Sequence, residues 1–387
     1  MIDLLLEHAG DPGREQQVLH ELSAHVAAVQ ASAGAGNRSQ VSAIEAAVQA
    51  DPANSFTFNP EGSGTLRTAA GTFPAGRFET PSIATLRQKS LAARGGSGGA
   101  RVRLWVLEGA SPATDIGSLQ ATAGPGTLFQ VASQFNCLES PGPFVTPITR
   151  YFSDPTQGPR ASISAFPGTF LRHYAAPGSD SQRFVQTTDG PQLNLLEGVC
   201  SPGVAQVRNG YLTSSDIAKP SALATALESR FEEIRVGVHD DLPVVLGYNW
   251  DGTVSGNRRI GQVFTSTFAG GEYSSTALSN TTDRLICTAL LRAAYLGTLL
   301  AARALGQPKV VLTLIGGGVF GNPVPLIWKS ILWAIDEVER YGAEVMDVVV
   351  NGRNLGDHLP LEEILPAVRA RGGAVVVFGP GMVSVRR

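Results

Sequence analysis

The segment Lys309–Asp336 constrains the fold of this chain more than any other part of the sequence. It opens with an apolar, β-branched run, Val310–Ile315, that suits a strand buried on both faces. The glycines Gly316–Gly318 follow, and an amphipathic helix begins near Pro325, a residue tolerated in a first helical turn. A strand, a glycine loop and a helix in this order present backbone N–H groups to an anion. We therefore expect this segment to bind a diphosphate.

The spacing of the glycines argues against the two common phosphate motifs. A P-loop needs Gly-Lys-Ser/Thr where this chain has Phe320-Gly321-Asn322. The run Gly316–Gly321 does fit the dinucleotide pattern G-x-G-x-x-G, but the acid downstream, Asp336, falls inside the predicted helix and not at the end of a second strand. A dinucleotide-dependent oxidoreductase stays open as an alternative, and so does a plain turn that packs the helix on the strand.

Composition narrows the class of protein. With 387 residues, 43% of them hydrophobic, the chain can bury a large core. The net charge of −3 and the lack of a long basic run argue against nucleic acid as a partner. The three Cys and six His lack metal-ligand spacing, so we expect neither a metal nor a cofactor. The N-terminus is not a signal peptide, and Arg292 and Arg303 interrupt the longest apolar stretch, which predicts a cytoplasmic protein without a membrane span.

The chain divides into two predicted parts. Residues 1–100 form an N-terminal extension with two helices in the first 50 residues and a Gly-, Ser- and Pro-rich remainder. Residues 101–387 alternate apolar strands with helices in their C-terminal half. This alternation predicts an α/β fold, a three-layer α/β/α sandwich with a mixed central sheet.

A second segment, FQVASQFNCLE at 129–139, ends a predicted strand at polar residues, where α/β sheets place ligands. Asn136 can donate and accept hydrogen bonds and so suits a ribose diol, although an ordinary Asn turn fits the same letters. Together with Gly316–Gly321, this segment resembles the macrodomain family, whose members bind ADP-ribose between an Asn-containing loop and a G-x-G-x-F-G diphosphate loop. The stretches DPTQGP (154–159), RNGY (208–211) and VHDD (238–241) look like those of MavL-type macrodomain ADP-ribosyl hydrolases, which remove ADP-ribose from arginine.

The resemblance implies a set of residues around ADP-ribose. An acid ahead of the Asn strand would hold the adenine; Asp115 matches best and Glu108 competes with it. His173, Tyr174 and Tyr211 are further candidates beside the distal ribose. The implied ligands of ADP-ribose are Asp115, Gln134, Phe135, Asn136, Gly316, Gly317, Gly318, Val319, Phe320, Gly321, Asn322 and Asn351.

The catalytic acids are harder to assign. Hydrolysis of an N-glycosidic bond needs a carboxylate to activate water. Poly(ADP-ribose) glycohydrolases carry paired glutamates after the Asn strand, and this chain has Cys137-Leu138-Glu139 there, so we do not expect that pair. The resemblance favours Asp241 and Asp251, on either side of a short strand expected at 244–247, although both also read as turn residues. Asp154 and Gln157 are the competing candidates.

The sequence thus predicts an ADP-ribosyl hydrolase. It would bind ADP-ribose and remove it from ADP-ribosylated protein side chains, with arginine as the expected linkage and ubiquitin as one candidate protein. Two alternatives remain at this stage: a module that binds ADP-ribose without hydrolysing anything, and the dinucleotide-dependent oxidoreductase.

Overall fold

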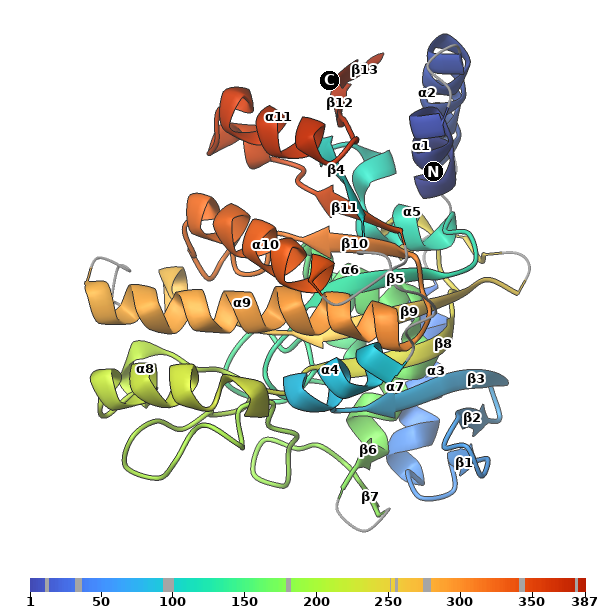
Figure 1. Cartoon of the computed structure of the whole chain (residues 1–387). Helices are drawn as coiled ribbons and strands as arrows, with labels where there is room; N and C mark the ends of the chain where they lie inside the picture. Colours follow the sequence, from blue (N-terminus) through green and yellow to red (C-terminus); the bar gives the residue numbers. More distant parts are fainter. Residues whose placement is uncertain are drawn as a thin grey trace.

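The protein is described here by a computed structural model that covers residues 1–10, 14–31, 37–92, 101–178, 182–250, 252–254, 257–273, 280–340, 345–379 and 382–387. Within these ranges, one sheet of eleven strands runs through the molecule in the order β1-β2-β3-β8-β9-β5-β10-β11-β4-β12-β13 (Figure 1). Its strands are β1 (Phe56–Phe58), β2 (Gly64–Thr68), β3 (Gly71–Glu79), β4 (Val102–Glu108), β5 (Thr127–Ala132), β8 (Gly237–Pro243), β9 (Arg259–Thr265), β10 (Lys309–Thr313), β11 (Met346–Asn351), β12 (Val375–Gly379) and β13 (Met382–Arg386). A separate two-stranded ribbon pairs β6 (Ala176–Pro177) with β7 (Arg183–Phe184).

The middle of the sheet is parallel and its flanks are antiparallel. The six neighbours β9, β5, β10, β11, β4 and β12 run in one direction, with Val310 of β10 opposite both Leu128 and Val348. Strands β8, β3, β2 and β1 on one side and β13 on the other continue the sheet antiparallel. The predicted mixed sheet is confirmed, and the apolar runs become central strands because both of their faces are covered by helices.

Helices cover both faces of the sheet. They are α1 (Ile2–Gly10), α2 (Glu15–Ala31), α3 (Arg38–Ala50), α4 (Ile83–Ala92), α5 (Ile116–Ala121), α6 (Gln157–Ser164), α7 (Phe166–Tyr174), α8 (Pro220–Ser229), α9 (Thr281–Ala304), α10 (Val324–Glu339) and α11 (Leu361–Ala370). In Figure 1, α4, α8, α9 and α10 lie over the near face, and α6 and α7 lie behind the sheet. The three-layer α/β/α prediction is therefore confirmed.

The order of the crossovers shows where a ligand crevice must open. The chain runs from β9 through α9, α10 and α11 to β12 in one direction across the sheet, and from β4 through α5 to β5 in the other. Since such crossovers are right-handed, the two sets of helices lie on opposite faces. Ligands bind outside the carboxyl ends of the strands where this direction reverses. Here that edge belongs to β5, β10 and β11.

Two parts of the sequence prediction are corrected by the sheet. Short strands are expected from the sequence near 234–238 and at 244–247, but the structure has one strand, β8, which begins at Gly237 and ends at Pro243, so that residues 244–247 lie outside it. Strand β8 runs antiparallel to β9 and carries Asp240 and Asp241 within it. Residues 56–79 of the predicted extension form β1–β3, and β3 pairs with β8, so the sheet extends into this segment. The boundary at residue 100 falls between α4 and β4, and stays a prediction as a domain boundary.

Helix α9 is the most deeply packed helix of the near layer, with fifteen buried residues. Among the described helices it alone is long and apolar enough to cross a membrane, but 78% of its most apolar window is buried inside the protein. Such burial is what a core helix under a wide sheet requires, because neighbouring helices cover its sides.

We predict that Leu299→Ala lowers the free energy of unfolding by about 2–5 kcal/mol, because Leu299 of α9 is fully buried and the smaller side chain leaves a cavity. Leu285→Ala is the matched control on the same helix, since 57% of the Leu285 side chain is exposed. Urea unfolding measures both variants. Equal losses would contradict the packing described for α9.

Candidate active site

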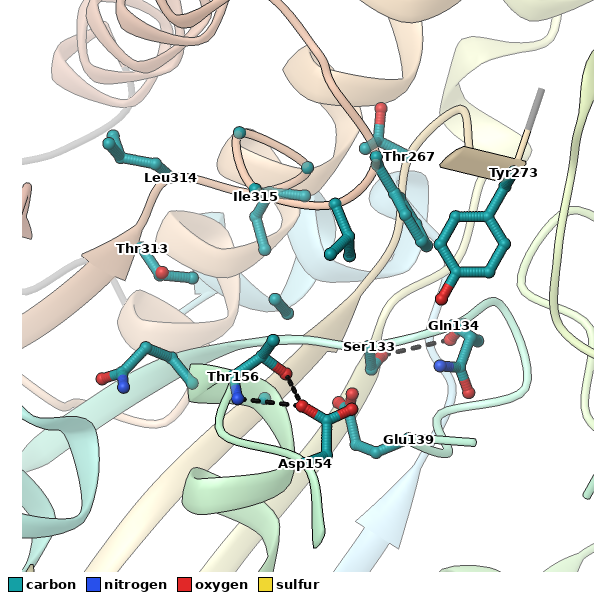
Figure 2. A pocket seen from close by; sticks show the side chains of 18 of the residues that line it. Ser133, Gln134, Glu139, Asp154, Thr156, Thr267, Tyr273, Thr313, Leu314 and Ile315 are labelled. Atoms are coloured by element: carbon teal, nitrogen blue, oxygen red, sulfur yellow. Dashed lines mark hydrogen bonds between the residues drawn. The ribbon is translucent and has the colours of Figure 1, made fainter. Parts of the chain in front are cut away.

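A cavity of about 310 Å³ opens at the carboxyl ends of the parallel strands. The last residues of three strands line it, Ala132 of β5, Thr313 of β10 and Asn351 of β11, together with Thr267 just after β9. Its volume lies within the usual range of small-molecule sites, roughly 300–1,000 Å³. Figure 2 shows Leu314 and Ile315 on one side and Asp154 and Glu139 on the other.

The glycine loop between β10 and α10 forms one wall. The backbone N–H groups of Gly318, Val319 and Phe320 have no hydrogen-bond acceptor within the described part of the chain, whereas those of Gly317 and Gly321 are bonded inside the loop. A Cβ atom on Gly318 would meet nothing within 4 Å, so this residue faces open space. Successive free amides of this kind form an anion-binding nest.

Asn322 fastens the two ends of this loop. Its Nδ2 atom donates to the backbone oxygens of Phe268 (3.0 Å) and Gly316 (3.2 Å), and its Oδ1 accepts from the thiol of Cys287 at 2.6 Å. Gly316 adopts φ = +71°, and a Cβ there would lie 2.4 Å from Asn322 Nδ2. Asn322 was predicted to contact ADP-ribose directly. In the structure its side chain is buried and holds the loop from behind, so the structure does not support this contact.

Helix α10 begins immediately after the loop and adds a positive end. Its first turn carries no acidic residue, and Pro323 at the N-cap makes no side-chain hydrogen bond. The positive end of the helix dipole is therefore unopposed by local carboxylates, which favours an anion in front of it.

The opposite wall is the loop after β5, and side chains hold the backbone N–H groups of Leu138, Glu139 and Ser140. The Asn136 Oδ1 accepts from the backbone N–H of Leu138 (3.1 Å), and the Tyr151 hydroxyl accepts from that of Glu139 (2.7 Å). Gln134 pairs with Ser140 through both its oxygen and its nitrogen, each at 2.9 Å. Three successive backbone N–H groups are fixed in this way, so the position of the Glu139 side chain is well determined.

Arg172 supports the same loop from below. Its guanidinium is fully buried, donates to the carbonyl of Cys137 and to Thr169, contacts His239 and lies 3.6 Å from the ring centroid of Phe264. Burial lowers the pKa of Arg172 to about 10, which leaves it charged at neutral pH. Cys137 is held at φ = +62°, an uncommon conformation for a side chain that tends to occur at functional sites. Burial also raises the pKa of its thiol to about 12, so Cys137 is not a nucleophile.

Glu139 reaches the cavity from this loop. Its side chain is buried, and its Oε1 atom has no hydrogen-bond partner among the described residues. Gly158 of α6 makes room for the carboxyl group, because a Cβ there would lie 2.6 Å from Glu139 Oε2. Burial, and then the charge of Asp154, raise the pKa of Glu139 well above its usual value. A buried carboxyl without a partner is costly, and such groups concentrate at functional sites.

Asp154 is the second acid of the cavity. Its Oδ1 atom accepts hydrogen bonds from the backbone N–H (2.8 Å) and the hydroxyl (2.6 Å) of Thr156. In Figure 2 the Asp154 and Glu139 side chains converge on the same part of the cavity. One acid is buried and has a raised pKa, and the other is half-buried and hydrogen-bonded, which is how a pair of carboxyl groups divides into an acid and a base.

Three aromatic rings close one end of the cavity. Tyr211 stacks on Tyr273 with ring centroids 5.0 Å apart, and Phe320 of the glycine loop lies 5.8 Å from Tyr211 and 5.3 Å from Tyr273. At another part of the lining, Asn351 donates to the carbonyl of Thr114, and its buried Oδ1 lacks a partner among the described residues. This oxygen can accept a hydrogen bond from a ligand.

The structure gathers most of the predicted residues around this one cavity. Those that line it are Gln134, Asp154, Gln157, Gly316, Gly317, Gly318, Val319, Phe320 and Asn351. Their roles toward a ligand remain predictions. Of the further candidates, Tyr211 lines the cavity, whereas His173 bonds Tyr151 and Tyr174 bonds Glu45 away from it.

Other predicted residues support the cavity from outside. Asn136 is fully buried, and its Nδ2 atom donates to Gln192, so it cannot reach a ribose. Phe135 packs in the core. Because Asn136 and Phe135 are both buried, the structure does not support their predicted direct contact with ADP-ribose. Gly321 is exposed next to the backbone of Gly271, and its contact with ADP-ribose stays a prediction.

Asp115 also lies behind the lining, and its competitor Glu108 does not line the cavity but accepts a hydrogen bond from the N–H of Gly356. Asp115 caps α5 through the N–H of Gly117 and pairs with Arg160 at 3.1 Å. The Gln157 amide lines the cavity but is occupied on both sides, accepting from Ile116 N (2.8 Å) and donating to Asp115 (3.2 Å). Gln157 therefore braces the start of α5, and its predicted catalytic role stays a prediction.

The two preferred catalytic acids are not in the cavity. Asp241 lies in β8 beside Arg259, the first residue of β9, and so at the amino end of the parallel strands, opposite to the cavity. The antiparallel direction of β8 is the cause: its residues approach that end as the chain advances. The expectation that Asp241 lies near Asn136 is wrong. Asp251 lies outside the described residues.

Sequence reasoning passed over Glu139. A signal for it existed, since Glu139 is the sole acidic residue between Ser133 and Ser153 in the sequence, directly after a strand that was predicted. Among the described residues, no group of three or more His, Cys, Asp or Glu side chains converges to hold a metal ion.

No protein-family model matches the chain, and no curated protein matches it. Among solved structures, the chain is similar to poly(ADP-ribose) glycohydrolase from Thermomonospora curvata, with 15% identity, 86% of this chain and 99% of that chain covered, and a TM-score of 0.39. It is also similar to poly(ADP-ribose) glycohydrolase from Deinococcus radiodurans in complex with ADP-ribose, with 12% identity, 76% and 93% covered, and a TM-score of 0.39. At these identities the similarity concerns the fold alone.

We predict that Gly318→Glu weakens the binding of ADP-ribose at least about 30-fold, or ~2 kcal/mol, because the side chain and its charge would occupy the space in front of the free amides. The variant should fold as well as the unaltered protein, since Gly318 has open space around it. Titration calorimetry with Gly318→Ala as the milder control measures the effect. Unchanged affinity in Gly318→Glu would place the anion elsewhere.

We predict that Glu139→Gln changes how stability depends on pH. The folded state raises the pKa of Glu139 above its ordinary value of 4.5, so it holds a proton that the unfolded chain releases. The resulting contribution to the free energy of unfolding is present below that value and is lost as pH rises toward the folded pKa. The melting temperature of Glu139→Gln should therefore rise relative to the unaltered protein as pH increases above 4.5.

Thermal unfolding at several pH values measures this difference. Glu197→Gln is the control, because 73% of the Glu197 side chain is exposed. If the curves for Glu139→Gln and the unaltered protein run parallel, Glu139 is not held neutral by burial.

Proposed function

We propose that the protein binds ADP-ribose in this cavity and hydrolyses the glycosidic bond between its distal ribose and a protein side chain. One observation carries the proposal: two features face each other across one cavity. The first is a nest of backbone amides without an acceptor among the described residues, and the second is a buried carboxyl group with a raised pKa and a second acid beside it. The first suits a diphosphate and the second suits glycoside hydrolysis.

The parts of ADP-ribose fit the lining in order. The diphosphate would accept hydrogen bonds from Gly318, Val319 and Phe320 in front of α10. The partnerless Oδ1 of Asn351 would accept from the exocyclic amine of adenine. The distal ribose would then lie toward Glu139.

The chemistry follows from the difference between the two acids. Neutral Glu139 donates its proton to the leaving side-chain atom as the bond to the anomeric carbon breaks. Asp154 accepts a proton from the attacking water as the new carbon–oxygen bond forms. The products are free ADP-ribose and the unmodified side chain, and one proton must return from Asp154 to Glu139 before the next turnover.

The more specific part of the proposal is the chemical linkage between ADP-ribose and the protein side chain. The resemblance to MavL-type macrodomains supports an arginine linkage, in which the leaving group is a guanidine and the broken bond is N-glycosidic. The same acid pair would also act on an oxygen leaving group, so glutamate- and serine-linked substrates belong in the same assay. Ubiquitin is one modified protein to include.

A binding module without hydrolysis is the second candidate, since the amide nest alone suffices to hold ADP-ribose. The position of Asp336 disfavours the oxidoreductase. Asp336 lies in α10 and pairs with Arg371, so it is not at the end of a strand, where it could hold a ribose diol. In addition, β11, the strand after α10, ends at Asn351 and not at an acid.

We predict that Glu139→Gln and Asp154→Asn each lower kcat by ~10²–10⁴ while ADP-ribose still binds, because each removes a proton-transfer group without removing the amide nest. Release of ADP-ribose from arginine-, glutamate- and serine-linked substrates measures turnover, and calorimetry measures binding. Asp241→Ala is the control at the opposite end of the sheet and should keep full turnover.

The outcome separates the candidates. Binding without release by the unaltered protein, on all three linkages, would favour the binding module. Full turnover in both Glu139→Gln and Asp154→Asn would overturn the assignment of the acids. Loss of turnover in Asp241→Ala would show that the wrong end of the sheet has been chosen.

A further inference from the structure

We propose that Glu45, in the N-terminal helix α3, positions both acids of the cavity by capping a short helix at residues 148–153. Asp154 follows this helix directly, and a side chain of the helix bonds the backbone of Glu139. The inference rests on the proposed function for its kinetic consequence, and on hydrogen bonds alone for its structural part. Glu45 lies 94 residues before Glu139 in the chain and does not line the cavity.

Glu45 is one of the few buried acids of the described chain, and its side chain is 3% exposed. Its Oε1 atom accepts from the backbone N–H of Ile148 (2.5 Å) and from the hydroxyl of Tyr174 (2.9 Å), and its Oε2 atom accepts from the N–H of Thr149 (2.9 Å). Three donors on one carboxyl group make it a fully satisfied buried acceptor.

The two amides are the first of a 3-10 helix, η3 (Ile148–Ser153). The residue at its N-cap, Pro147, makes no side-chain hydrogen bond. The orphan N–H groups at a helix start are ordinarily satisfied by a side chain of the cap residue. Here Glu45 does so from a distant part of the chain, which ties the position of η3 to α3.

η3 in turn determines where both acids lie. Asp154 follows its last residue directly, and its N–H donates to the carbonyl of Tyr151 at 3.0 Å. Tyr151, within η3, accepts from the N–H of Glu139 and is bonded through the same hydroxyl to His173, both at 2.7 Å. Burial lowers the pKa of His173 to about 3, so its ring is neutral and shares one hydrogen bond with the Tyr151 hydroxyl. A shift of η3 therefore displaces Asp154 and the Glu139 amide together.

The test compares Glu45→Ala with Ile44→Ala in the full-length protein. Ile44 is fully buried on the same helix, so its replacement destabilises α3 without removing the cap of η3. Glu45→Ala should lower kcat ~10–10²-fold with little change in KM, because displaced acids weaken the chemical step more than they weaken diphosphate binding. Glu45→Gln keeps one acceptor oxygen and should lose less.

Hydrogen exchange gives a readout that needs no turnover. In Glu45→Ala, exchange should accelerate at least about tenfold at Ile148 and Thr149 and also at Glu139, while Ile44→Ala leaves Glu139 unchanged. Full kcat in Glu45→Ala, or a loss of kcat matched by Ile44→Ala, would overturn the positioning role. If the unaltered protein neither binds nor hydrolyses ADP-ribose substrates, the proposed function fails. The positioning role of Glu45 is then tested separately by hydrogen exchange, and unchanged exchange at Glu139 in Glu45→Ala would overturn it.

Discussion

The satisfaction of backbone N–H groups is the constraint on which this site depends. Around the cavity, side chains bind the amides of Leu138, Glu139 and Ser140 in the loop after β5. In the loop after β10, by contrast, the amides of Gly318, Val319 and Phe320 have no acceptor in the part of the chain that the structure describes. The first arrangement fixes a side chain in place, and the second keeps donors available for a ligand. The chemistry proposed for the cavity follows from this difference between its two walls.

The buried cation of Arg172 has a part in both the fold and the site. It holds the carbonyl of Cys137 in a loop where the backbone adopts an uncommon conformation, and it stacks on the core residue Phe264. It also opposes the burial effect on Glu139, although burial remains the larger influence on that carboxyl. A buried charge of this kind is retained where a loop must keep one conformation.

The sequence predicts the elements of this fold whose pattern is local. The apolar strand and glycine loop at 309–321 were predicted because β-branched runs and consecutive glycines have few structural readings. Most of strand β8 was missed because HDDLP interrupts the apolar pattern, and only its pairing with β3 and β9 shows that the strand runs through these residues. This error placed Asp241 at the wrong end of the sheet. Glu139 was not predicted as a catalytic acid for a related reason. The environment of its carboxyl group depends on Gly158, Tyr151 and Arg172, which are not its neighbours in the sequence.

The pairing of β3 with β8 also bears on how the chain folds. Residues 77–79 of β3 pair with residues 238–240 of β8, so this part of the sheet requires contacts between residues that are distant in the sequence. Topologies with many such contacts fold slowly. Until residues 71–79 are in place, β8 presents a row of unpaired backbone groups of the kind that recruits other chains. With β1–β3 in place, the edge on this side of the sheet is the three-residue strand β1, which leaves little backbone for another chain to pair with.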